Sequence, residues 1–253
     1  MTVPETTNTS PVSIPVHIPT LPPIRSTTSS RSTSSSTSTT LSTVSHLSDR
    51  PIAEVTFRHG RVEDAPYLTD LQFSNYRYHY KELMGDSFLD RLVPADMTKF
   101  HASRLTPPVD QREMGYVVAE QKDPKTGELG VIGMSQVIVP YWDRAHSHRF
   151  YEGWSQDDFD CEIDTLYVKL GVQGGGLGRK LVFGAMQEGY DRLNMRGAVI
   201  IWTMIGNIQG REFYKRIGCE EVGERILEVN GVELECVAYG FRDIGRELGL
   251  ESK

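Results

Sequence analysis

The sequence predicts a mixed α/β fold in which helices cover a single sheet. Two observations point to this class. Short runs rich in branched and aromatic residues are typical of strands, and other segments repeat apolar residues at helical spacing. Their order is one strand, two helices, three strands, a helix, a strand, a helix and two strands, which suits one sheet with helices packed on it.

The predicted strands rest on alternating or continuous short apolar runs. They are expected at residues 53–58, 115–121, 131–139, 162–168, 198–204, 221–228 and 232–241. Asn230-Gly231 is the strongest short turn signal in the chain and predicts that the last two strands form a hairpin. Residues 140–160 show no clear period, so we expect a long connection there.

The predicted helices rest on apolar residues that recur on one helical face. The first is expected to start near Asp64, which can cap it, with Pro66 in its first turn. A second helical region is expected over residues 76–100, broken at Gly85. Two later helices are expected at 177–193 and 207–217.

The first 50 residues differ in composition from the rest of the chain. Residues 1–24 contain six prolines, and 18 of the 23 residues from 26 to 48 are Ser or Thr. Such a segment has little apolar surface to bury, so residues 1–50 are expected to be a disordered tail and 51–245 the folded domain. A mitochondrial transit peptide is the alternative interpretation of this arginine- and serine-containing stretch, although its prolines disfavour it.

Charge and cysteine usage narrow the classes of function. The net charge of −7 argues against a nucleic-acid partner and is compatible with a cationic substrate. No run of about 18 apolar residues predicts a membrane span. Three widely spaced cysteines indicate reduced thiols in a cytoplasmic or nuclear protein. A homodimer is compatible with the sequence.

The stretch 162–180 combines a strand, a glycine turn and the start of a helix. The turn contains the glycines Gly174, Gly175, Gly176 and Gly178. Glycines before a helix expose backbone N–H groups and the helix N-terminus to an anion. Neither nucleotide motif fits, because Gly178 is not followed by Lys-Ser/Thr and because Arg179 stands where a dinucleotide-binding loop has its third glycine. A tight turn with close helix packing is the structural alternative.

The spacing Gln173-x-x-Gly176-x-Gly178 resembles the acyl-CoA motif, Gln/Arg-x-x-Gly-x-Gly/Ala, of the GNAT superfamily of N-acyltransferases. A second block, from Asn207 to Cys219, resembles that family's Asn-x-x-Ala-x-x-Phe-Tyr-x-x-x-Gly-Phe. The resemblance extends over about residues 161–241 and, more weakly, back to about residue 55.

The second block departs from the family pattern twice. Gly210 stands in place of the usual alanine, at a cost of about 1 kcal/mol in helix propensity. Cys219 replaces the usual aromatic residue after the glycine.

The resemblance implies a central, mostly antiparallel twisted sheet and acetyl-CoA as cosubstrate, with no metal. In that fold the strand ending at Val168 and the strand beginning at Ala198 diverge, and pantetheine lies in the gap between them. By this resemblance the residues expected to bind the cosubstrate are Leu166, Tyr167, Val168, Gln173, Gly174, Gly175, Gly176, Leu177, Gly178, Arg179, Lys180, Asn207 and Phe213.

Acetylation of an amine calls for a base. At pH 7 an amine with a pKa of about 10.4 is neutral about once in 2,500, a cost of about 4.6 kcal/mol. Glu162 lies six residues before Val168, where the histone-acetylating branch of the superfamily carries a basic glutamate. Asp164 follows on the same strand face and is expected to contact the substrate. The alternative for Glu162 is a solvent-facing charge at a strand end.

Tyr214 matches the family's tyrosine that faces the CoA sulfur. Proton transfer from a tyrosine of pKa about 10 to a thiolate of pKa about 8.5 is uphill by about 2 kcal/mol. A hydrogen bond to the departing sulfur is therefore the more economical role. The alternative is a helix tyrosine packed in the core.

The aperiodic segment 140–160 suggests an acceptor pocket that includes Trp142 and Trp154, or else a surface flap held by its aromatic residues. A metal site at His146-x-His148 is disfavoured because no third ligand is positioned. Cys161 is disfavoured as a nucleophile because lone cysteines are usually buried.

The sequence thus predicts an N-acetyltransferase that transfers an acetyl group from acetyl-CoA to a primary amine by direct attack, with Glu162 and Tyr214 as catalytic residues. The acceptor is expected to be a small molecule. Two alternatives stay open: an acetyltransferase acting on protein N-termini or lysines, and a non-catalytic acyl-CoA-binding protein.

Overall fold

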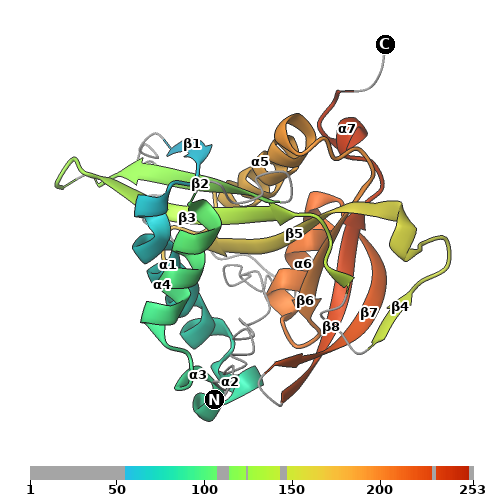
Figure 1. Cartoon of the computed structure of the whole chain (residues 1–253), viewed down its shortest axis with the longest axis horizontal. Coiled ribbons are helices and arrows are strands. Elements are labelled where there is room, and N and C mark those ends of the chain that lie inside the picture. The colour runs from blue at the N-terminus through green and yellow to red at the C-terminus, as the bar shows by residue number, and fades with distance from the viewer. Residues whose placement is uncertain (1–54, 107–113, 124, 143–146, 230–231, 251–253) are drawn as a thin grey trace, which may run out of the picture.

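The computed structural model describes residues 55–106, 114–123, 125–142, 147–229 and 232–250. Within these residues eight strands form one sheet with helices on both faces, which confirms the predicted fold class (Figure 1). The tail 1–50, His146 and the turn Asn230-Gly231 lie outside the described residues. No helix in the described ranges has the length and hydropathy of a membrane span.

The sheet has the order β1-β2-β3-β5-β6-β8-β7-β4. Its strands are β1 (Val55–His59), β2 (Met114–Lys122), β3 (Leu129–Ile138), β4 (Ser147–Phe150), β5 (Phe159–Val168), β6 (Ala198–Met204), β7 (Glu220–Val229) and β8 (Val232–Phe241). Neighbouring strands are antiparallel except β5 and β6, which are parallel. The sheet is thus mostly antiparallel, as expected.

The helices pack on the two faces of this sheet. They are α1 (Ala65–His79), α2 (Lys81–Met84), α3 (Asp86–Leu89), α4 (Pro94–Leu105), α5 (Leu177–Arg192), α6 (Ile208–Ile217) and α7 (Ile244–Glu247), with 3-10 turns at Val62–Asp64 and Gln156–Asp158. Helices α1 to α4 cover one side, called here the α1 face, and α5 and α6 cover the other, the α5 face. Figure 1 shows α1 and α4 together, away from α5.

Two details differ from the sequence-based expectations. The segment 140–160 is not one irregular connection: it contains β4, which pairs with β7 at the edge of the sheet. Four residues are too few to reveal a period, so the pattern could not predict this strand. Asp64 precedes α1 without capping it through its side chain, and instead accepts two hydrogen bonds from Arg58, at 2.7 and 2.8 Å.

The strands β5 and β6 diverge in the middle of the sheet. Their pairing runs from Phe159 and Ala198 to Glu162 and Ile200, where it ends. Both strands continue beyond that point, β5 to Val168 and β6 to Met204. The splayed arrangement expected from the sequence is therefore present, and it opens directly after Glu162.

A β-bulge lies on β5 just past this point. Gln136 of β3 pairs with Thr165 and Val137 pairs with Ile163, so Asp164 is the extra residue. A bulge brings two successive side chains toward one face and bends its strand. Asp164 contacts Arg104 of α4, and the Thr165 hydroxyl donates to Gln136 at 3.2 Å. The bulge thus adds polar side chains to the α1 face of β5.

Candidate active site

The turn between β5 and α5 is built from glycines in left-handed conformation. Gly174, Gly175 and Gly176 have φ values of 104°, 57° and 78°, and Gly176 is the N-cap of α5. The backbone N–H of Leu177 donates to the carbonyl of Gly174 at 3.2 Å. The N–H groups of Gly178 and Arg179 lie in the first turn of a 16-residue helix, before Lys180, whose N–H donates to the Gly176 carbonyl at 3.0 Å. This geometry suits an anionic group near the helix start.

A pocket of about 240 Å³ lies beside this turn. Its lining residues are Val168, Gln173, Gly174, Gly176, Leu177, Gly178, Arg179, Phe213, Arg216 and Ile217. The structure therefore brings together the end of β5, the glycine turn and α6. Most residues predicted to bind the cosubstrate meet here, although Lys180 is exposed and is not among those lining the pocket.

Sequence reasoning missed two residues of this pocket, Arg216 and Ile217. They lie three and four residues after Phe213 on α6, which places all three on one helix face. Their spacing from Phe213 could have predicted that they face the same pocket. Arg216 adds a second arginine beside Arg179, so the pocket has two guanidinium groups near the glycine turn.

Close packing at Gly178 connects the turn to α6. A Cβ at Gly178 would lie 3.2 Å from Cζ of Phe213, so a larger residue would push the phenyl ring. Gln173 donates from its side-chain amide to the carbonyl of Val168 at 3.5 Å, which folds the turn back on β5. Both contacts fix the shape of the pocket wall.

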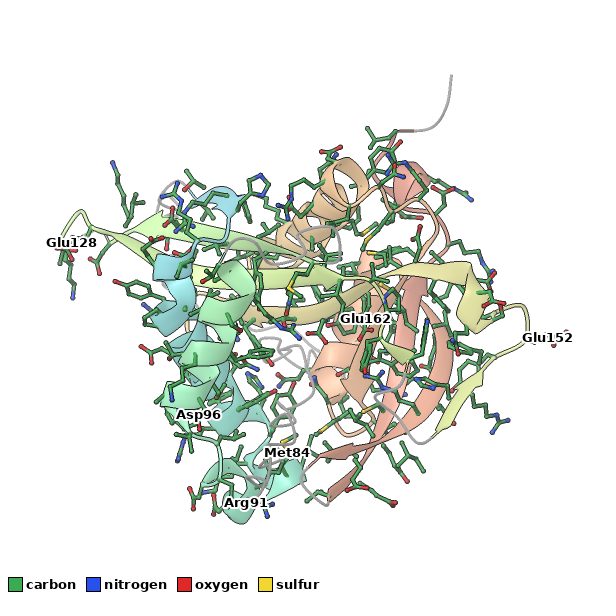
Figure 2. All side chains as sticks on the ribbon, in the orientation of Figure 1. Met84, Arg91, Asp96, Glu128, Glu152 and Glu162 are labelled. Atoms are coloured by element: carbon green, nitrogen blue, oxygen red, sulfur yellow. The ribbon has the colours of Figure 1, made fainter. Side chains whose placement is uncertain are left out.

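Glu162 lies at the point where β5 and β6 part. It is 2% exposed and pairs with Ile138 on one side and Ile200 on the other. Its neighbours Cys161 and Ile163 belong to the core of the α5 face, so alternation directs Glu162 to the α1 face. Figure 2 shows it in the middle of the molecule, beside β5. It is a buried carboxylate, not the solvent-facing charge of the alternative interpretation.

Asp164 is part of a buried polar network on the α1 face. The Arg104 guanidinium lies 3.6 Å from its carboxylate and 4.2 Å from the centroid of Phe100. His101, one turn earlier on α4, is 3.3 Å from the Tyr116 hydroxyl through Nδ1 and 2.8 Å from the Gln72 carbonyl through Nε2. Helix α4 therefore supplies polar groups to the same side of the sheet as Glu162.

The partners of His101 define its protonation. The carbonyl of Gln72 can only accept, so Nε2 carries the proton and Nδ1 accepts from Tyr116. Burial, followed by the charge of Arg104, lowers the pKa of His101 to about 4, while Asp164 opposes that shift. Burial raises the pKa of Tyr116, so its hydroxyl stays a donor. His101 is thus a neutral structural link near pH 7.

Tyr214 is fully buried on the α5 face, where its ring stacks on Tyr239 at 5.5 Å and meets Phe213 at 5.2 Å. Its hydroxyl has no hydrogen-bond partner among the described residues. Burial raises the pKa of Tyr214 well above its usual value. A hydroxyl that stays protonated and lacks an acceptor is suited to donate to a ligand atom.

The predicted aromatic residues of the acceptor side lie at β4 and around it. The ring of Trp142 is 5.5 Å from His148 and 5.9 Å from Phe150, close to the α1-face core. The ring of Trp154 stacks on Phe159 at 5.1 Å, with the Arg242 guanidinium 4.0 Å from its centroid. Trp154 therefore packs against Phe159 at the start of β5.

Comparisons with known proteins identify the fold and the family. The model of the Acetyltransferase (GNAT) family matches residues 77–219, more than half of the chain. The chain belongs to the GNAT acetyltransferase family. The matched range contains Glu162, the glycine turn and Tyr214. The cosubstrate predicted from the sequence, acetyl-CoA, is the acetyl donor of this family.

Solved structures agree with this assignment at the level of the fold. The PaiA N-acetyltransferase of Thermoplasma acidophilum in complex with coenzyme A has 11% identity and a TM-score of 0.52, over 75% of this chain and 99% of that one. Spermidine N-acetyltransferase of Vibrio cholerae in complex with CoA and spermine has 15% identity and a TM-score of 0.51, over 77% and 98%. A search of curated proteins found no match.

The contacts of Asn207 explain why Gly210 stands where the family pattern has alanine. Asn207 caps α6 by accepting from the Gly210 N–H at 3.0 Å, and its amide donates to Thr203 at 3.0 Å and Tyr80 at 3.3 Å. A Cβ at residue 210 would clash with the Asn207 side chain. Glycine at 210 therefore makes room for an asparagine that joins β6, α6 and the start of α2. Asn207 is not among the residues lining the pocket.

The remaining predicted residues lie at the end of β5 and in the core. Leu166 is fully buried on the α5 face, and Tyr167 on the α1 face, 6.0 Å from the ring of Tyr76. Cys161 and Cys219 are buried free thiols whose pKa values are raised by burial. No cluster of three or more His, Cys, Asp or Glu side chains that could hold a metal occurs among the described residues.

Proposed function

We propose that this GNAT domain transfers the acetyl group of acetyl-CoA to a small primary amine by direct attack. One observation carries the proposal: a buried carboxylate, Glu162, lies where β5 and β6 separate, and the glycine-turn pocket begins at the end of the same strand. An amine site and a thioester site would then adjoin along one strand, which brings the two reactants together.

The glycine turn is the proposed pyrophosphate site. The N–H groups at the start of α5 supply hydrogen-bond donors, and Arg179 and Arg216 line the same pocket. Val168 and Phe213 give the pocket an apolar wall suited to pantetheine. These features support acetyl-CoA as the ligand.

Glu162 is the proposed base. A substrate amine is an ammonium at neutral pH, and a buried carboxylate both attracts it and accepts its proton, directly or through water. The amine nitrogen then attacks the thioester carbonyl, a C–N bond forms, the C–S bond breaks to release the CoA thiolate, and the nitrogen gives its second proton to solvent. Asp164 stands two residues further along β5, beside Arg104, and is proposed to help hold the ammonium.

Tyr214 is the proposed partner of the leaving group. Its hydroxyl is buried without an acceptor in the described part of the chain, and its raised pKa keeps it protonated. It can donate a hydrogen bond to the departing thiolate without giving up its proton.

The alternative of an acyl-cysteine intermediate gains no support, since burial raises the pKa of Cys161 well above its usual value.

The experiment is to measure release of free thiol from acetyl-CoA with panels of small amines and of peptides carrying a free N-terminus or a lysine. Turnover of small amines supports the proposal. Turnover confined to peptides would show that the acceptor is a protein amine. Binding of acetyl-CoA without any amine-dependent thiol release would show a non-catalytic acyl-CoA-binding protein.

A further inference from the structure

A second group of nitrogen-bearing side chains lies on the α1 face beyond Glu162. His148 of β4 and Arg225 of β7 are directly opposite each other in the sheet. The Arg225 guanidinium carbon lies 4.2 Å from the centroid of Trp202 on β6, and the His148 ring lies 5.8 Å from the same indole. Trp142, one of the predicted substrate contacts, packs against His148. Nitrogen atoms of three side chains, Trp202, Arg225 and His148, therefore lie close together on this face.

Two of these side chains have polar atoms that the described protein does not satisfy. Trp202 is 2% exposed, and its indole Nε1 has no hydrogen-bond partner among the described residues. The Nε2 atom of His148 is likewise buried without a partner there. An unmet buried donor costs about 1–3 kcal/mol, so such groups point to an acceptor atom supplied by a ligand.

Trp202 and Arg225 lie on the same face of the sheet as Glu162. Ile200, the residue of β6 that pairs with Glu162, belongs to the same α1-face core as Trp202. Trp202 follows Ile200 by two residues, about 7 Å along a strand. The Arg225 guanidinium, above the Trp202 ring, is thus on the same face as Glu162. It lies past Ile200, the last residue of β6 that pairs with β5.

We propose that Trp202, Arg225 and His148 form a carboxylate-binding subsite, so that the preferred acceptor is an amine that carries a carboxylate several bonds away. This inference rests on the proposed function. A guanidinium pairs with a carboxylate through two parallel hydrogen bonds, and the indole N–H adds a third donor. Glu162 receives the ammonium end and Arg225 the anionic end, which gives the acceptor one orientation with its nitrogen near the thioester.

The same arrangement disfavours a diamine. Its second ammonium would lie against the Arg225 guanidinium in a buried setting, where like charges repel more strongly than in water. A monoamine without a charged tail would leave the Trp202 N–H unsatisfied. Selectivity therefore depends on the group at the far end of the acceptor, not on the amine itself.

The test compares acceptors of equal length. For chains of three to six carbons, the ω-amino acid, the alkylamine and the diamine are assayed for kcat/KM by thiol release. At the best length the ω-amino acid is expected to exceed both others at least 10-fold. Equal or better use of the alkylamine or diamine would overturn the subsite while leaving the proposed function intact. Absence of turnover with every amine would contradict the proposed function.

Variants locate the effect. Arg225→Met should raise KM for the ω-amino acid at least 10-fold and leave the alkylamine unchanged, and Arg225→Lys should recover part of the loss. Trp202→Phe removes one donor and should have a smaller effect of the same kind. The matched control is Arg242→Met, because Arg242 also lies over a tryptophan, at 4.0 Å, but outside this group. A folded Arg225→Met protein with unchanged selectivity would refute the inference.

A binding measurement tests the subsite without catalysis. Calorimetric titration of the CoA-bound protein should give a Kd at least 10-fold lower for the ω-amino acid than for the alkylamine of equal length. No binding of the ω-amino acid, or binding retained in both Arg225→Met and Trp202→Phe, would overturn the subsite whatever the outcome of the kinetic assay.

Discussion

The two sides of the candidate site are constructed in different ways. The glycine-turn side comes from one continuous stretch, from Val168 to Arg179, with one face of α6 added. The carboxylate side draws on α1, α4 and strands from β2 to β7, which supply Gln72, His101, Tyr116, Glu162 and Arg225. The first side adds exposed backbone N–H groups to its side chains, whereas the second presents side chains alone.

This difference indicates which side of the site determines specificity for the acceptor. A backbone site recognises a constant group, the diphosphate of a cosubstrate, and depends on a few glycine positions. A side-chain site gathered from distant segments can vary residue by residue without loss of the fold. The donor side should therefore be sensitive to backbone changes, and the acceptor side to charge.

The largest effect is expected at the glycine turn. Gly176→Asp and Gly178→Asp should weaken acetyl-CoA binding more than 100-fold by calorimetry, because each adds a Cβ and a negative charge where the diphosphate approaches. Gly176 has φ 78°, and a Cβ at Gly178 would press on Phe213. The control is Gly171→Asp, which carries similar backbone strain at φ 84° but does not line the pocket. Normal affinity in the first two variants would place the site elsewhere.

The acceptor side should respond to charge through pH. Glu162→Gln should lower kcat about 100-fold at pH 6.5, within the range typical of general-base catalysis, and activity should recover in part toward pH 8.5 as more amine is neutral. Affinity for acetyl-CoA should change little, which separates the two sides. Full activity of this variant at pH 6.5 would instead make Asp164 or an ordered water the base candidate.

Tyr214 lies between these extremes. Tyr214→Phe should slow kcat by roughly 10- to 100-fold, the loss expected for one hydrogen bond to a charged group, with little variation from pH 6 to 8.5. Because the hydroxyl has no partner in the described part of the chain, its removal should not lower the free energy of unfolding. A large loss of stability would reveal a structural role, and full turnover with chemistry rate-limiting would reduce Tyr214 to packing.

The smallest effect concerns His101. Its pKa is about 4 in the folded protein and near 6.5 when unfolded, so the unfolded state binds the proton first as pH falls. The free energy of unfolding should then decrease by about 1 to 2 kcal/mol between pH 7 and pH 5. Urea unfolding of His101→Asn should show less of this decrease. His59→Asn, at a largely exposed histidine, should keep it. An unchanged pH dependence in His101→Asn would contradict this assignment.

The fold was largely accessible from the sequence, for a physical reason. Strand β6 was predicted with its observed bounds because its seven residues are all buried and form one apolar run. The divergence of β5 and β6 came from the family resemblance. Strand β4 was missed, since four residues carry no period. The helical region predicted over 76–100 contains the end of α1, then α2, α3 and much of α4, and its predicted break at Gly85 does separate α2 from α3.

The site was accessible only where it is continuous. The glycine spacing indicated the turn, the family resemblance indicated Tyr214, and helical spacing from Phe213 would have indicated Arg216 on α6. No spacing relates Arg104 to Asp164 or Arg225 to Trp202, because these contacts join segments far apart in the chain. Such pairs follow from strand order and register, which one sequence does not contain.

The side chain of Asn207 links the donor side of the site to the acceptor side. It fastens α6, whose Phe213 and Arg216 line the donor pocket, to Tyr80 at the start of α2 on the acceptor side. If cosubstrate binding shifts α6, the Asn207 side chain moves with it and displaces Tyr80 through their hydrogen bond. Coupling of this kind is reciprocal, so each substrate should tighten the other's binding by the same factor. We expect the Kd for acetyl-CoA, measured by calorimetry, to fall when the acceptor is present, and Asn207→Ala to abolish that synergy.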